Sequence, residues 1–134
     1  MRKSIRYLLL TFGILVFALN SFAQKHAQSD ADKAFNNGAY YKAIVLYKKA
    51  LGYISNQHIK GAKKIRANIM FQIAECYRLT GDFKHDIEEY GKAIKGKCDD
   101  TLAAKQYIEE AEEEMAKHKD TVIHYQSKVL MDPR

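Results

Sequence analysis

The chain is poor in residues that interrupt helices and in residues that cross-link small folds. Its 134 residues include one proline and seven glycines, which leave little room for long unstructured linkers. The two cysteines, Cys76 and Cys98, are far apart and form no CxxC pattern. They are too few for a disulfide framework or a structural zinc site. With 47% apolar and 28% charged residues, the composition is that of one soluble globular domain behind an apolar N-terminus.

The sequence also lacks the motifs of catalytic and metal sites. Its five histidines are His26, His58, His85, His118 and His124. None stands three or four residues from another, the spacing that places two ligands on one helix face. No HExxH motif, glycine-rich phosphate loop or Ser-His-Asp pattern is present. The glutamates of residues 109–114 are expected to be solvated on a helix, not gathered in a dry pocket. We therefore expect no catalytic, metal or cofactor site.

The N-terminal 23 residues have the pattern of a secretory signal peptide. Positive residues at the start precede the apolar run of residues 7–19, and Ser21-Phe22-Ala23 offers small residues for cleavage after Ala23. The alternative is an uncleaved anchor, but a membrane span needs about 20 apolar residues. No cysteine follows the run, which argues against a lipoprotein. The pattern predicts export, with no membrane span after cleavage.

The remaining charge is too small to indicate nucleic-acid binding. The formal net charge of +6 falls to +3 without Arg2, Lys3 and Arg6, because 19 basic residues then face 16 acidic ones. The segment from His58 to Arg66 is basic. It could contact an acidic partner or a membrane surface, although a solvated helix face is the interpretation we favour.

The stretch from Asn68 to Ile94 predicts a helical hairpin. Apolar residues recur at helical spacing in both halves: Ile69, Ile73 and Tyr77, then Phe83, Ile87, Tyr90 and Ile94. Between them, Gly81 can adopt the left-handed geometry that ends a helix, and Asp82 can cap the next one. One hairpin cannot bury both of its apolar faces, so the pattern implies neighbours.

An upstream stretch repeats this pattern at an offset of 43 residues. Seven positions align without a gap: Gly38, Tyr40, Ala43, Ile44, Tyr47, Ala50 and Leu51 with Gly81, Phe83, Asp86, Ile87, Tyr90, Ala93 and Ile94. Six match in kind, and Asp86 in place of Ala43 is the exception. The pattern G-x-aromatic-x-x-A-I-x-x-Y-x-x-A-L resembles a tetratricopeptide (TPR) repeat. The resemblance covers residues 27–95 well and 101–133 poorly. It implies an all-α stack of antiparallel helical hairpins, about three in number, the last one degenerate.

The expected TPR-like domain comprises residues 24–134, with repeats at about 27–57, 58–97 and 101–133. In the first repeat, Ser29 or Asp30 would cap a short helix from Ala31 to Asn37. The offset of 43 residues exceeds the usual period of about 34. We expect the extra residues to extend the first helix of the second repeat back to about His58, with Asn56 as its cap.

The last repeat departs most from the pattern. Residues 101–117 predict a strong helix, and Val122, Tyr125 and Val129 have the spacing of a second one. His118 stands where an aromatic residue is usual, and no glycine marks the turn. A terminal repeat is often atypical because its outer face meets water. Equally, the chain could be a shortened version of a longer array.

The hairpin geometry predicts that the two cysteines stay unpaired. The loop that holds Cys98 should lie near Ala67, and Cys76 is roughly 13 Å further along the helix by rise per residue. A disulfide requires α-carbons within about 7 Å. An intermolecular bond through Cys98 is the less favoured alternative.

The TPR resemblance also implies a binding groove formed by the first helices of successive hairpins. The residues that it assigns to this groove are Asp32, Phe35, Asn36, Asn68, Phe71, Glu75 and Arg78. They lie off the apolar stripes of their helices, as groove residues must. Phe71 is either a second packing contact or a binding anchor, and packing is favoured because the next hairpin must cover some part of this one.

Two stretches, ADKAFNNGAYYKAIVLYKKAL and FQIAECYRLTGDF, resemble the N-terminal TPR region of exported OmpA-family and type IX secretion-associated envelope proteins of Bacteroidota. The resemblance implies a non-catalytic scaffold, in the periplasm or on the periplasmic face of the outer membrane, that binds a protein partner. The downstream domains of those proteins are not in this sequence, so cell-wall binding is assigned to no residue. The alternatives are a self-associating structural subunit, a homo-oligomer, and a truncated fragment of a larger OmpA-like protein.

Overall fold

The structure, a computed structural model, describes residue 7 and residues 25–54 and 61–130, with side chains described as far as residue 123. The described residues form helices and turns, and none of them is in a strand. The all-α prediction is therefore confirmed. Apart from Tyr7, the predicted signal peptide lies outside the described residues. Among the helices that are described, none is both long and apolar enough to span a bilayer. The chain divides into two compact units, Met1–Ala62 and Lys63–Arg134.

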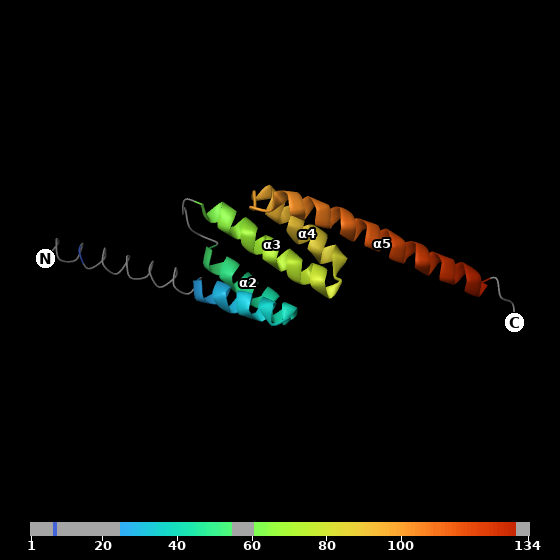
Figure 1. The fold of residues 1–134 in the computed structure, drawn as a ribbon, viewed down its shortest axis with the longest axis horizontal. Helices are drawn as coiled ribbons and strands as arrows, with labels where there is room; N and C mark the ends of the chain where they lie inside the picture. Colours follow the sequence, from blue (N-terminus) through green and yellow to red (C-terminus); the bar gives the residue numbers. More distant parts are fainter. Residues whose placement is uncertain (1–6, 8–24, 55–60, 131–134) are drawn as a thin grey trace. The chain divides into compact units, whose positions relative to one another are not determined.

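The first unit contains a helix over residues 25–36 and α2, Tyr40–Ile54 (Figure 1). Gly38 joins them with a φ of 73°, the left-handed conformation that glycine adopts without strain. The predicted short helix from Ala31 is wrong at its N-terminal end, because helix is already present at Lys25. Ala27 is buried one turn before Ala31, so the apolar stripe continues backwards.

The predicted cap at Ser29 or Asp30 is also wrong, because Ser29 lies within the helix and so does Asp30. Its carboxylate is 3.7 Å from His26 and 3.4 Å from Lys33 on the same helix. On α2, the buried residues are Ala43, Ile44, Tyr47, Ala50 and Ile54. Every member of the aligned series on α2 from Ala43 to Ala50 is thus buried, as the repeat pattern predicts.

The second unit contains α4, Phe83–Lys95; α5, Thr101–Leu130; and α3, Ala62–Thr80, from Lys63 onwards. The first helix of this unit begins later than expected. Gly61 has a φ of 89°, which an α-helix cannot accommodate, so α3 begins at Ala62 and not near His58. The expected cap at Asn56 lies outside the described residues.

The turn between α3 and α4 has the predicted chemistry. Gly81 has a φ of 75°, and its N–H donates to the carbonyl of Arg78. Asp82 caps α4, because its Oδ1 accepts a hydrogen bond from the backbone N–H of His85 at 3.4 Å. Both signals read from the sequence are therefore confirmed here.

The predicted third hairpin is wrong. α5 runs unbroken over 30 residues, through the position where a turn was expected near His118. The physical reason is that residues 101–130 contain no glycine or proline, so nothing interrupts the i to i−4 hydrogen bonds. Figure 1 shows α5 beside α4 and continuing past it, and the described residues from 112 to 123 are all exposed.

Small residues let the helices of the second unit approach closely. Ala74, Tyr90 and Ala104 form one buried cluster, and Ala67, Ala93 and Cys98 form another. A side chain at Gly96 would place its Cβ 2.6 Å from the Cβ of Ala67, so this position admits only glycine without rearrangement. Cys76 and Cys98 are both free and buried, in agreement with the prediction that they do not pair.

Candidate functional site

Each hairpin contains the same kind of tertiary contact, at equivalent positions in its sequence. The hydroxyl of Tyr47 on α2 donates a 2.6 Å hydrogen bond to Oδ1 of Asp32. The hydroxyl of Tyr90 on α4 donates to Oε1 of Glu75 on α3. In both cases the tyrosine follows its carboxylate partner by 15 residues. Each hairpin therefore ties its second helix to its first through a buried tyrosine.

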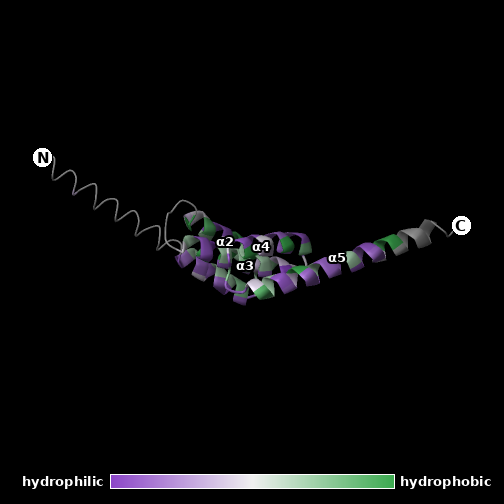
Figure 2. Cartoon of the chain, turned by 90° about the horizontal axis from the view of Figure 1, so that it is seen from above, coloured by the Kyte–Doolittle hydropathy of each residue, from purple (hydrophilic) through white to green (hydrophobic). Residues whose placement is uncertain are grey.

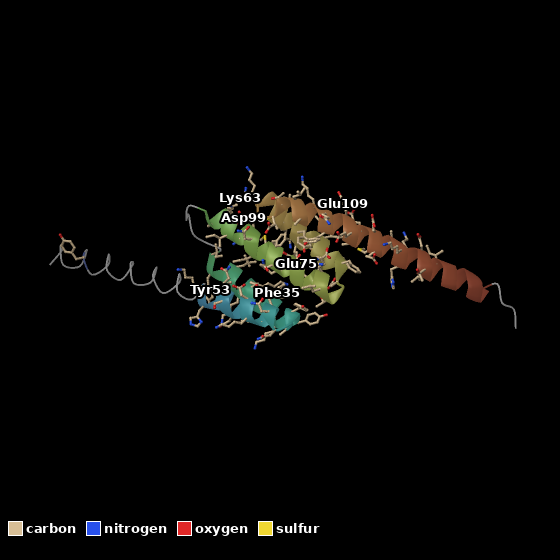
Figure 3. All side chains as sticks on the ribbon, viewed as in Figure 1. Phe35, Tyr53, Lys63, Glu75, Asp99 and Glu109 are labelled. Carbon is tan, nitrogen blue, oxygen red and sulfur yellow. The ribbon has the colours of Figure 1, made fainter. Side chains whose placement is uncertain are left out.

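In the second hairpin this contact belongs to a larger polar cluster. The Arg78 guanidinium binds both oxygens of Glu75, with Nε 3.2 Å from Oε1 and Nη2 2.7 Å from Oε2. It also lies 4.5 Å from the centre of the Tyr107 ring, which α5 supplies. Figure 3 shows Glu75 at the middle of α3. We call Glu75, Arg78, Asp86 and Tyr90 the acid–arginine cluster.

The pKa of both groups that bind Glu75 is raised. The pKa of Arg78 is raised, chiefly by its hydrogen bond to Glu75. Burial raises the pKa of Tyr90, and the Glu75 carboxylate raises it further. At neutral pH the guanidinium is thus charged and the phenol is protonated, the states that their contacts with Glu75 require.

Asp86 is the unusual member. It is fully buried, at 0% exposure, and neither of its carboxylate oxygens has a hydrogen-bond partner among the described residues. Burial raises its pKa to about 6; Arg78 opposes this shift, whereas Asp82 and Glu75 add to it. The equivalent residue in the first hairpin is Ala43, which is buried to the same extent. A buried carboxylate therefore stands where the first hairpin has a buried alanine.

Three predicted groove residues lie on the helix over residues 25–36. Asp32 is exposed and accepts the hydrogen bond from Tyr47. Phe35 is half-buried, with its ring edge-on to Tyr40 at 5.6 Å between centroids. Asn36 is exposed. This face of the helix therefore offers an acceptor, an aromatic ring and an amide.

The four predicted groove residues on α3 are engaged within the second unit. Nδ2 of Asn68 donates to Asp99 at 2.6 Å, and the amide of Asn68 also holds the backbone of the loop before α5. Phe71 packs edge-on against Tyr90 at 5.3 Å, as the packing interpretation predicts. Glu75 and Arg78 bind one another. The contacts of these four side chains are therefore internal to the second unit, where they help to position α4 and α5.

The chain was compared with protein-family models, curated proteins and solved structures. No protein-family model, curated protein or solved structure matches the chain.

The described residues contain no group of three or more His, Cys, Asp or Glu side chains arranged to hold a metal ion. The acid–arginine cluster can instead orient helices and bind a proton at Asp86. Sequence reasoning missed the roles of Asp86 and Tyr107. The signal for Asp86 was available, because it is the single mismatch in the aligned repeat. No comparable signal identifies Tyr107, whose partner is 29 residues away in the sequence.

Proposed function

We propose that this chain is a non-catalytic scaffold of the cell envelope, built as a TPR-like stack, that binds a segment of another protein. The observation that carries the proposal is the tyrosine–carboxylate contact that both hairpins share. A contact that recurs at the repeat offset supports one structural unit used twice. Stacked units of this kind form rigid, extended surfaces suited to binding a peptide or helix.

The proposed binding surface is centred on Phe35 and Asn36. An aromatic ring that keeps part of its surface accessible beside an exposed amide supplies both an apolar anchor and hydrogen bonds for a bound backbone. The four α3 residues first expected to contact the partner directly would act by keeping the repeat rigid, since their polar groups and rings are already in contact with the same unit. Two sequence features support the proposed envelope location: the signal-peptide pattern of residues 1–23, and the resemblance to exported envelope proteins.

The test is site-specific photo-crosslinking in envelope preparations. A photoreactive phenylalanine analogue replaces Asn36 in one variant, and exposed Lys49 of α2 in a control variant. We expect a discrete protein adduct at position 36, absent at position 49, and weakened when Phe35→Ala is added. Equal adducts at both positions, or none at position 36, would reject this surface. N-terminal sequencing of the same material tests cleavage after Ala23.

A further inference from the structure

The second unit carries a basic hollow on its surface, between the start of α3 and the end of α4. Its volume is about 380 Å³. Four cationic residues line it: Lys63, Arg66, Lys92 and Lys95. Ala67, Met70 and Gly96 make up the rest of the lining and give the hollow an apolar part. Figure 3 shows Lys63 at the start of α3, projecting outward.

The positive charge of this hollow is only partly neutralised. Lys92 binds Glu88 at 2.7 Å and Glu89 at 2.8 Å. No carboxylate in the described part of the chain forms an ion pair with Lys63, Arg66 or Lys95. In addition, the first turn of α3 contains no acidic residue to offset the positive end of the helix dipole. The hollow therefore favours an anionic occupant.

The same unit carries a stretch of the opposite charge on α5. Its exposed glutamates are Glu109, Glu110, Glu112, Glu113 and Glu114. Two pairs of these, 109 with 113 and 110 with 114, stand four residues apart, where like charges destabilise a helix by about 0.2–0.5 kcal/mol each. Lys117 binds Glu114 at 2.8 Å, and Gln106 donates to Glu110. We call residues 109–114 the acidic stretch; Figure 2 shows hydrophilic colour along much of α5.

We propose that the basic hollow of one molecule binds the acidic stretch of a second copy of this chain. The charges are complementary, and Met115, 44% exposed beside the stretch, can contact the apolar lining near Met70. The acidic stretch does not fill the hollow of its own molecule. Ala104 is buried in the cluster with Ala74 and Tyr90, and Tyr107 packs against that cluster, so α5 is held with its glutamates exposed. The two surfaces differ, so the contact is head-to-tail and leads to rings or open chains.

The test is sedimentation velocity on the full chain and on two charge-reversal variants. One variant carries Lys63→Glu and Lys95→Glu, and the other carries Glu110→Lys and Glu113→Lys. We expect the native chain to associate at low salt and to dissociate at an ionic strength of about 0.5 M, where the Debye length is only a few ångströms. Each variant alone should be shifted at least tenfold toward monomer. An equimolar mixture of the two should associate again, because each supplies the surface that the other retains.

A matched control reverses Lys42 and Lys49, two exposed lysines of α2, for the same change in net charge. This variant should associate like the native chain. The proposal is overturned if the hollow variant still self-associates, if the mixture stays monomeric, or if association is insensitive to salt, as contact between apolar N-termini would be. It is also overturned if the hollow variant keeps native self-association but loses binding to vesicles of anionic lipid.

Discussion

The phenol of Tyr90 on α4 donates a hydrogen bond to the carboxylate of Glu75 on α3, and Arg78 binds the same carboxylate from one turn further along. The first hairpin has the tyrosine contact without the arginine, because Phe35 stands at the position equivalent to Arg78. The shared element is therefore the tyrosine–carboxylate pair, and the arginine is an addition in the second hairpin.

This pair predicts a measurable contribution of each phenol to stability. Tyr90→Phe and Tyr47→Phe should each lower the free energy of unfolding by about 1–2 kcal/mol, because each removes a hydrogen bond from a buried tyrosine to a carboxylate. Urea denaturation followed by circular dichroism measures the change. Tyr41→Phe is the control, since Tyr41 is 69% exposed, and it should have no effect. A neutral result at both buried tyrosines would show that the two contacts do not stabilise the hairpins.

Replacing the buried carboxylate of Asp86 should stabilise the protein. Asp86→Ala is expected to raise the free energy of unfolding by about 1–3 kcal/mol near pH 7, because it removes two acceptors that lack partners. The reciprocal change, Ala43→Asp, should destabilise by about 2–4 kcal/mol, since it buries a carboxylate in the first hairpin. A loss of stability in Asp86→Ala would mean that the carboxylate has a favourable partner in solution.

The raised pKa of Asp86 predicts how the free energy of unfolding varies with pH. The folded-state pKa of Asp86, about 6, lies above its ordinary value of 3.8, so the folded chain retains a proton that the unfolded chain releases. The destabilisation by Asp86 is therefore absent well below pH 3.8, grows as the pH rises, and is complete above about 6. Its total is at most about 3 kcal/mol. The difference in unfolding free energy between native and Asp86→Ala, measured from pH 4 to 8, should follow this curve; a flat difference would refute the assignment.

The close packing of α3 against Gly96 predicts that a side chain at this position destabilises the fold. Gly96→Ala should destabilise by about 1–3 kcal/mol, because its Cβ would meet the Cβ of Ala67 at 2.6 Å. Gly91→Ala is the matched control within α4. No heavy atom lies within 4 Å of a Cβ built there, and the change should stabilise by up to about 1 kcal/mol. Thermal denaturation of both variants checks the opposite signs.

The two cysteines should be inert in the folded chain. Cys76 is fully buried, and its burial raises its pKa to about 12, so its reactive thiolate is scarce at neutral pH. Cys98 is buried at 5% exposure. An aromatic disulfide reagent at pH 8 should label neither thiol until denaturant is added, and then both. Rapid labelling of one thiol under native conditions would show local opening around it.

The sequence by itself determined the features that depend only on residues near one another along the chain. The glycines at 38 and 81 mark turns because only glycine adopts a positive φ without strain, and Asp82 caps α4 because its side chain is short enough to reach the next turn. The burial of Tyr47 and Tyr90 follows from helical periodicity, which depends only on spacing. The absence of glycine and proline from residues 101–130 also indicated that α5 is continuous. The TPR resemblance instead predicted a turn near His118, which is wrong.

Tertiary structure alone decided which side chains meet. Lys63 and Lys95 line the same hollow although 32 residues separate them, because α3 and α4 are antiparallel and α4 ends near the start of α3. Arg78 meets Tyr107 only because α5 packs against α4 and brings the ring there. Periodicity specifies a face of a helix, whereas the partner of that face depends on helix packing, and therefore the charged contacts could not be read from spacing.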